Sequence, residues 1–198
     1  MKANSFIKIS VSVALLLFST MRASSNDRVV NIKSQHKNSP QNFKLSKIQK
    51  SSKYKLENEN LVFSFKTKNS KMMSLCIDKN EQYIVYRFGT ADNIELEFPT
   101  SKDKNSFNNF VYTGWDRGGG VRNEGMNLNY IAFEIKDYKY IIYETYFAVG
   151  DVFKVGVRII NLKTNKEVDI RGLNNTIKGT LSDFRTDDRI KKGDRLYD

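Results

Sequence analysis

The sequence predicts an all-β protein, with a single antiparallel β-barrel or β-sandwich of about eight or nine strands. Three observations favour this fold class. Short runs in which apolar and polar residues alternate recur from residue 61 onward. Turn-forming Asn, Asp and Gly residues separate these runs, and no long stretch shows the apolar period of a helix. At 198 residues the chain is long enough for one domain with a hydrophobic core and too short for two.

Residues 1–25 have the composition of a secretory signal peptide. Lys2 and Lys8 come before an apolar run from Ile9 to Phe18, and small residues from Ala23 to Ser25 follow. The apolar run is shorter than the roughly 20 residues that a membrane-spanning helix requires. We therefore expect a periplasmic or secreted protein with no transmembrane segment after signal removal. A buried hydrophobic helix is the alternative.

Residues 26–58 are predicted to form a flexible basic tether. They are rich in Lys, Ser, Asn and Gln and contain few large apolar residues, so they bury too little apolar surface to offset the entropy of folding. Removal of residues 1–25 lowers the formal net charge from +11 to +8, because Lys2, Lys8 and Arg22 are lost. A basic tail can lie on anionic lipid, lipopolysaccharide or nucleic acid; the alternative is a solvated leader.

The domain is predicted to span residues 59–198, and its first four strands follow from alternation. They are Leu61–Lys66, Met72–Ile77, Gln82–Phe88 and Ile94–Phe98. The fourth alternates apolar residues with two glutamates and ends before Pro99, because proline cannot donate a hydrogen bond to a sheet.

Five further strands are expected after a polar loop at residues 101–109. They are Phe110–Trp115, Asn127–Lys136, Tyr138–Phe147, Phe153–Leu162 and Val168–Ile170. The remaining segment, residues 174–198, is charged and less periodic. Its apolar residues are its expected anchors in the core, namely Leu181, Phe184, Ile190, Leu196 and Tyr197.

The histidine and cysteine content argues against several chemistries. His36, the one histidine, lies in the predicted tether, so no Ser-His-Asp or Cys-His arrangement can form in the predicted domain. One Cys and one His cannot supply an ordinary zinc site. We expect no metal and no cofactor. Cys76 is the one cysteine, so no intramolecular disulfide can form; it is predicted to be buried in a strand, with an intermolecular disulfide as the alternative.

Carboxylates remain as candidate catalytic groups. A glycosidase needs two carboxyl groups about 5 to 10 Å apart across a cleft, and Glu95 and Glu97 project from one face of a predicted strand. Other carboxylates lie near the central loop, namely Asp116, Glu124, Glu134 and Glu144. The alternative for the strand pair is a solvated outer face, which its apolar neighbours favour, and we name no catalytic residue.

The segment Trp115–Gly125 is the most distinctive local feature. Three consecutive glycines allow backbone conformations that are closed to other residues, and no Gly-Lys-Ser/Thr follows, so this is not a phosphate-binding loop. Trp and Arg are enriched where a few contacts dominate binding. The candidate binding residues are Trp115, Asp116, Arg117, Gly118, Gly119, Gly120 and Arg122. A long passive connection between strands is the alternative.

Nucleic acid is not an expected partner. The many tyrosines and basic residues invite that interpretation, because single strands stack on aromatic rings along a basic groove. Most of these tyrosines lie in predicted strands, where aromatic residues are favoured in any case. Predicted export argues further against nucleic acid.

Several segments together resemble an uncharacterised family of small exported bacterial all-β proteins. They are SLC at Ser74–Cys76, YIVYRFG at Tyr83–Gly89, IELEFP at Ile94–Pro99, the RGGG of Arg117–Gly120 with Asn123 and Gly125, and the final KKGDRLYD. The resemblance covers residues 72–198 and implies export and an all-β domain, but no activity. A weaker, architectural likeness is to secreted bacterial lysozyme inhibitors, small β proteins that block an enzyme cleft with a loop. This chain has one cysteine where the C-type inhibitors have a bridging pair.

The sequence therefore favours an exported, non-enzymatic binding protein of the bacterial envelope, and such a protein could act as an inhibitor of its partner. Its partner would be a protein or an envelope polymer such as a glycan, engaged through the Trp115–Gly125 loop. A carbohydrate-active hydrolase with paired carboxylates and an envelope structural or toxin-neutralising protein are the alternatives.

Overall fold

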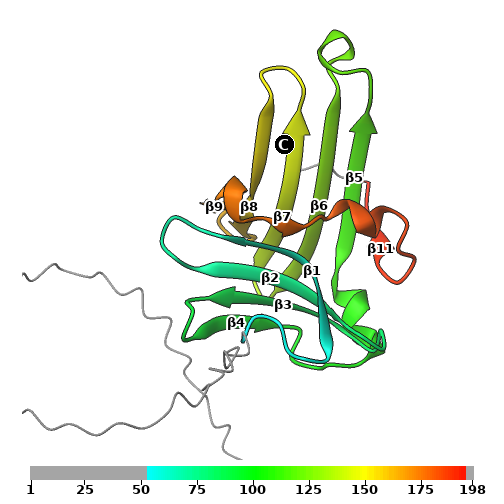
Figure 1. Ribbon diagram of the computed structural model, residues 1–198. Helices are drawn as coiled ribbons and strands as arrows, with labels where there is room; N and C mark the ends of the chain where they lie inside the picture. Colours follow the sequence, from blue (N-terminus) through cyan, green and yellow to red (C-terminus); the bar gives the residue numbers. More distant parts are fainter. Residues whose placement is uncertain (1–52, 195–198) are drawn as a thin grey trace, which may run out of the picture. The chain divides into compact units, whose positions relative to one another are not determined.

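The computed structural model describes residues 53–194. The predicted signal peptide and most of the predicted tether, His36 included, lie outside these residues. Within them the chain forms eleven strands in two sheets, connected by short turns and four 3₁₀ helices (Figure 1). No helix in the described part is long and apolar enough to cross a membrane.

The first sheet has five strands in the order β10-β1-β2-β3-β4. Its strands are β1 (Glu59–Lys66), β2 (Met72–Asp78), β3 (Ile84–Gly89), β4 (Ile94–Phe98) and β10 (Lys178–Gly179). All its pairings are antiparallel, and β1 to β4 form a meander through tight turns. Alternating apolar residues, such as Phe63 and Phe65 of β1, share one buried face.

The second sheet has six strands in the order β11-β5-β6-β7-β8-β9. They are β5 (Val111–Arg117), β6 (Met126–Ile135), β7 (Tyr138–Phe147), β8 (Val152–Asn161), β9 (Glu167–Arg171) and β11 (Lys191–Lys192). Strands β5 to β9 are antiparallel, whereas β11 pairs with β5 in parallel.

The main core lies between the two sheets, whose strands run across one another (Figure 1). A cluster of aromatic rings joins the layers: the ring centroids of Tyr86 in β3 and Phe133 in β6 are 5.0 Å apart, and Phe98 of β4 stacks on Phe133 at 4.9 Å. Aromatic pairs at this separation stabilise a core beyond the area they bury. The arrangement is sandwich-like, and neither sheet closes into a barrel.

The segment after β9 links the two sheets. It adds β10 to the edge of β1, passes through the 3₁₀ helix η4 (Ser182–Arg185), and adds β11 beside β5. Its predicted anchors Leu181, Phe184 and Ile190 are at most 1% exposed and belong to the main core. Leu196 and Tyr197, the other two predicted anchors, lie outside the described residues.

Residues 53–58 lie against the face of the first sheet that is turned away from the core. Tyr54 is buried there, and its carbonyl oxygen accepts hydrogen bonds from Ser74 Oγ at 2.7 Å and Cys76 Sγ at 3.3 Å. The Tyr54 hydroxyl donates to the carbonyl of Thr90 at 2.7 Å. This last part of the predicted tether is thus tied to strand β2 and to the turn after β3.

The all-β prediction is confirmed, and each of the nine expected strands corresponds to one of β1 to β9. The additional strands β10 and β11 have two residues each. Two-residue strands are too short to show alternation, so the sequence pattern does not predict them. The expected polar loop at residues 101–109 contains the 3₁₀ helix η1 (Lys104–Asn109), capped by the Asp103 carboxylate, which accepts from Asn105 N–H at 2.7 Å.

Candidate functional site

The candidate binding loop connects the neighbouring strands β5 and β6 at one end of the six-stranded sheet. Strand β5 ends at Arg117 and β6 begins at Met126. Between them, Gly119 and Gly120 have φ values of +94° and +61°, a conformation that favours glycine. A Cβ at Gly119 would lie 2.7 Å from the Cβ of Asn123, whereas one at Gly118 would meet nothing within 4 Å. Two of the three consecutive glycines are therefore required by the backbone.

Hydrogen bonds within the loop give it a defined shape. Gly125 N–H donates to Gly120 O at 2.8 Å, and the Asn123 side-chain amide donates to Gly118 O at 2.8 Å. Arg117 Nε donates to Glu124 O at 3.1 Å, which closes the base of the loop. The neighbouring β7–β8 turn is attached as well, because Ala148 N–H donates to Gly125 O at 2.8 Å. These hydrogen bonds indicate an ordered loop rather than a flexible connection between β5 and β6.

The alternation of β5 divides the predicted binding residues between the two faces of the sheet. Asp116 faces the same way as Tyr112, toward the other sheet, while Trp115 and Arg117 face outward. Gly118, Gly119, Gly120 and Arg122 lie exposed at the tip of the loop. The structure therefore brings Trp115 and Arg117 together but separates both from Asp116.

On the inner side, Asp116 belongs to a polar network that the sequence did not reveal. Its carboxylate accepts from the Asn127 amide at 3.0 Å and lies 3.8 Å from Nη1 of Arg185 in η4. Arg185 also donates to Asn129 Oδ1 at 3.2 Å, and Tyr112 donates to the same oxygen at 2.7 Å. Arg185 lies in a segment far along the chain from β5, so no local pattern could have predicted its contact with Asp116.

The loop end carries exposed apolar surface. The exposed fractions are 52% for Trp115, 66% for Val121 and 55% for Val149, which lies in the attached β7–β8 turn. These three are half of the six large apolar side chains that are exposed among residues 53–194. Grouped exposed apolar side chains on an ordered loop are typical of an interaction surface.

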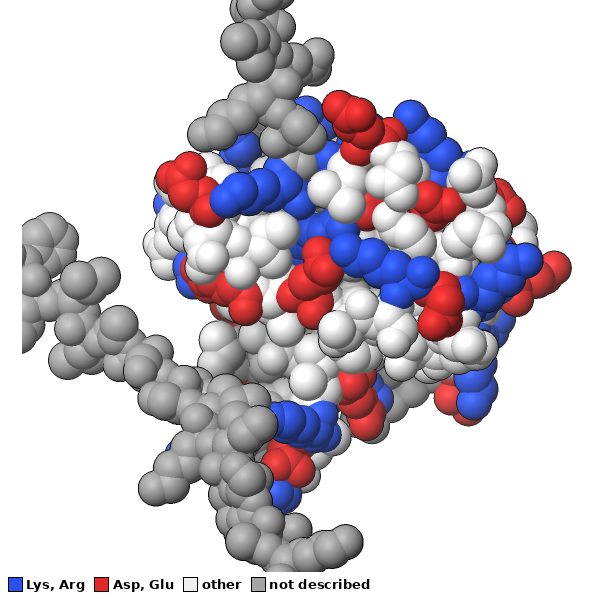
Figure 2. Space-filling view, turned by 90° about the horizontal axis from the view of Figure 1, so that it is seen from below, with Lys and Arg blue, Asp and Glu red and all other residues white. Residues whose placement is uncertain are grey.

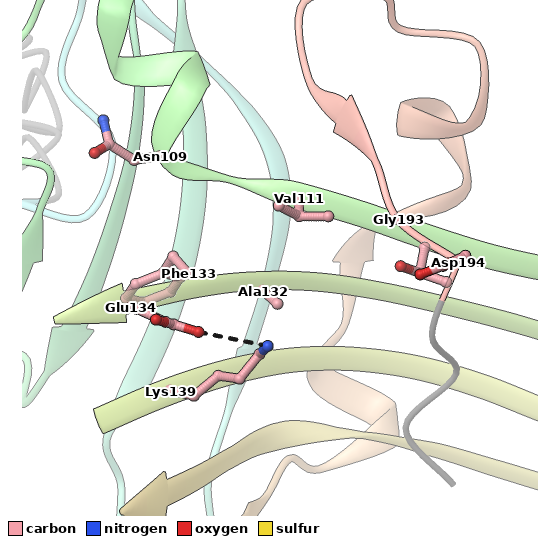
Figure 3. A pocket seen from close by; sticks show the side chains of 9 residues that line it. Asn109, Val111, Ala132, Phe133, Glu134, Lys139, Gly193 and Asp194 are labelled. Atoms are coloured by element: carbon pink, nitrogen blue, oxygen red, sulfur yellow. Dashed lines mark ion pairs between the residues drawn. The ribbon is translucent and has the colours of Figure 1, made fainter. Parts of the chain in front are cut away.

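The carboxylates considered for catalysis are dispersed and partnered. Glu95 pairs with Lys71 at 2.6 Å on the first sheet, and Glu124 lies 3.5 Å from Arg117 at the loop. Glu134 lies near the other end of β6, where it points toward Lys139 at 3.5 Å in a hollow of about 430 Å³ (Figure 3). Since β6 is ten residues long, Glu134 and the loop are at opposite ends of the sheet.

Glu144 is a buried carboxylate with an unusual environment. One of its oxygens accepts from Thr180 Oγ1 at 2.8 Å and from Leu181 N–H at 2.6 Å. Burial raises the pKa of Glu144, nearby Asp183 adds to this, and the two hydrogen bonds only partly offset it. The contacts of this side chain hold the segment after β10 against β7.

Arg87 lies at the centre of a buried ion-pair network on the first sheet. It is 1% exposed and makes two hydrogen bonds to Glu59, at 2.6 and 2.8 Å, and one to Glu97 at 2.6 Å. Burial opposes ionisation of Glu59 and Glu97, but their hydrogen bonds with Arg87 outweigh it and hold both pKa values below the ordinary range. Glu97, expected on a solvated face, is thus tied to a buried guanidinium.

Cys76 is buried in strand β2, as the sequence predicts, and its Sγ lies against the Tyr54 carbonyl. Burial and the nearby Glu59 charge raise the pKa of its thiol to about 12. A thiol of this kind is protonated and unreactive at neutral pH. Among residues 53–194, no three His, Cys, Asp or Glu side chains are grouped as metal ligands would be.

Basic and acidic residues nearly balance in the described part of the chain. They contain 23 Lys and Arg against 20 Asp and Glu, a net charge of +3, so most of the basic excess lies in residues 1–52. Figure 2 shows basic and acidic side chains interspersed on one face. Long-range attraction to polyanions would therefore depend more on the first 52 residues than on the sheets.

Comparisons with protein-family models, with curated proteins and with solved structures found no match.

Proposed function

We propose that this protein is an exported, non-enzymatic binding protein of the bacterial envelope that engages a protein or glycan through the Trp115–Gly125 loop. The observation that supports it best is the exposure of Trp115, 52%, at the base of a loop that hydrogen bonds hold in one shape. A large aromatic side chain on an ordered loop contributes contact area at a low cost in conformational entropy.

The flanking residues support the same proposal. Arg117 lies on the same face as Trp115, and Arg122 and Val121 project at the tip. Trp and Arg are the residue types most enriched among contacts that dominate binding energy. The composition of residues 1–25 supports export.

Affinity capture with a matched control tests this function. Immobilised protein is incubated with envelope and culture-medium extracts, and retained proteins and glycans are identified by mass spectrometry. The variant Trp115→Ala/Arg117→Ala should lose the partner that the wild type retains. The control Lys136→Ala/Tyr138→Ala removes a cation and an exposed aromatic residue from the opposite hairpin, β6–β7, and should retain it. Equal retention by the wild type and the loop variant would contradict the proposal.

A further inference from the structure

An apolar cluster lies on the outward face of the six-stranded sheet, which is turned away from the main core. Its members alternate along β6 and β7 with main-core residues such as Ile131 and Ile142. Leu128 is 0% exposed and Tyr130 is 1% exposed. The remaining members are Ala132, Ile141 and Tyr143, each at most 7% exposed. The cluster is therefore buried although it faces outward.

Among residues 53–194, this cluster packs against apolar residues of its own sheet. The partly buried residues in contact with it are Met126, Phe147 and Ile160, which belong to β6, β7 and β8. Side chains on one face of a sheet stand beside one another, and the free face of an antiparallel sheet commonly meets water. A tyrosine that is 1% exposed on such a face needs a cover. The cover therefore comes from outside residues 53–194.

The described chain ends beside this face of the sheet. Pairing of β11 with β5 stops after two residues. A Cβ at the next residue, Gly193, would lie 2.6 Å from Thr113 Oγ1 and 2.9 Å from Val111 Cγ1, two outward-facing side chains of β5. Gly193 and Asp194 also line the hollow that contains Ala132 of the cluster (Figure 3). The backbone thus leaves the edge of β5 and passes toward the cluster.

Residues 195–198, with the sequence Arg-Leu-Tyr-Asp, have the length and the chemistry to provide this cover. Four extended residues span about 13 Å, and neighbouring strands lie about 4.8 Å apart, so the segment can cross from β5 over β6 and β7 to β8. Leu196 and Tyr197 supply the apolar surface that the cluster requires. At the other end of the described range, residues 53–58 lie against the first sheet instead.

Basic side chains on the far side of the cluster complement the same segment. Lys154 and Arg158 of β8 border a hollow beside the cluster, together with Arg171 of β9. Asp169 is the one carboxylate among the residues that line this hollow. Three cations against one carboxylate favour an acidic residue at this place, and Asp198 is the residue that the segment would bring there.

We propose that residues 195–198 lie across the outward face of the six-stranded sheet, with Leu196 and Tyr197 over the apolar cluster and Asp198 beside the basic side chains of β8. This inference goes beyond the proposed function and does not depend on it. In the register of the sheet, Trp115 is opposite Leu128. A segment over Leu128 therefore lies next to the exposed tryptophan ring and belongs to the surface that a partner of the loop meets.

Hydroxyl-radical footprinting of the full-length protein tests the inference. In the wild type, Tyr130 should be oxidised as slowly as Tyr86, a main-core tyrosine that is also 1% exposed. Leu196→Ala/Tyr197→Ala should speed oxidation of Tyr130 several-fold and leave Tyr86 protected. It should also raise the unfolding equilibrium constant about tenfold or more, because apolar burial is lost. The control Leu162→Ala/Tyr138→Ala removes the same two side-chain types from positions that are each 44% exposed, and should leave both oxidation rates unchanged.

Nuclear Overhauser contacts in the unaltered protein decide the question even if the double variant fails to fold. We expect contacts from Leu196 and Tyr197 to Leu128 or Tyr130, and from Asp198 to the basic side chains of β8. They should arise within one molecule in a mixture of labelled and unlabelled protein.

Several results would overturn the inference. A folded double variant in which Tyr130 stays protected would show that another segment covers the cluster. Contacts of residues 195–198 with Gly114 and Asp116 alone would mean that the segment continues along the edge of β5. Contacts found only between labelled and unlabelled molecules would assign the cover to a second copy of the chain.

Discussion

Replacement of Glu59 by Gln should destabilise the domain strongly. The substitution keeps the size of the side chain but removes its charge, which leaves Arg87, 1% exposed, with Glu97 as its remaining carboxylate partner in the network. Removal of one partner from a buried ion pair costs about 3 to 5 kcal/mol, because the other charge stays buried. For a domain of this size, 3 kcal/mol corresponds to a fall in melting temperature of about 10 °C.

Urea unfolding followed by circular dichroism measures this change. Glu95→Gln is the matched control, because it breaks the exposed pair between Lys71 and Glu95 on the same sheet and should cost less than about 1 kcal/mol. The ionised form of Glu59 is the stabilising one, since its pKa is lowered on folding. The stability difference between the wild type and Glu59→Gln should be full above the ordinary carboxyl pKa and should shrink as pH falls through the lowered pKa. Equal destabilisation by the two variants would refute this reasoning.

Three further predictions concern other buried or strained positions. Because folding raises the pKa of Glu144, its stability contribution is present below the ordinary carboxyl pKa and is lost as pH rises through the raised value. The stability of the wild type relative to Glu144→Gln should therefore fall as pH rises through that interval, and a pH-independent difference in urea unfolding would contradict this. Gly119→Ala should destabilise the loop by about 1 kcal/mol or more, since it combines a φ of +94° with a clash at Asn123, whereas Gly118→Ala should be tolerated. Hydrogen exchange of the loop amides should be faster in Gly119→Ala than in Gly118→Ala, and equal exchange in the two variants would contradict this prediction. The Cys76 thiol should resist alkylation in the folded protein and react on unfolding; rapid labelling without denaturant would disprove its burial.

Alternation along the chain is sufficient to predict the fold class and the positions of β1 to β9. Strands such as β7 and β8 are long, and their inward residues repeat every second position, so the pattern is unambiguous. The pairing of β10 and β11 with distant strands leaves no local signal, because it depends on a segment that crosses between the sheets.

The candidate site was predictable only in part. A tryptophan followed by an arginine and three glycines marks the loop in the sequence, and the structure places Trp115 and Arg117 on one exposed face. Alternation predicts that Asp116 faces away from Trp115 and Arg117 only if the strand continues to Arg117, as β5 does. The contact between Asp116 and Arg185 leaves no local signal, since it depends on a distant segment that crosses between the sheets.

The binding role of the loop is tested most directly through Trp115, the one tryptophan of the chain. Within this protein its fluorescence reports on the loop alone and requires no label, and the emission of the partner measured by itself is subtracted. When the captured protein or glycan is added, we expect a blue shift of the emission and protection from acrylamide quenching, because the exposed ring becomes buried. A partner that binds with unchanged emission and unchanged quenching would contradict the proposal that the loop is the binding site.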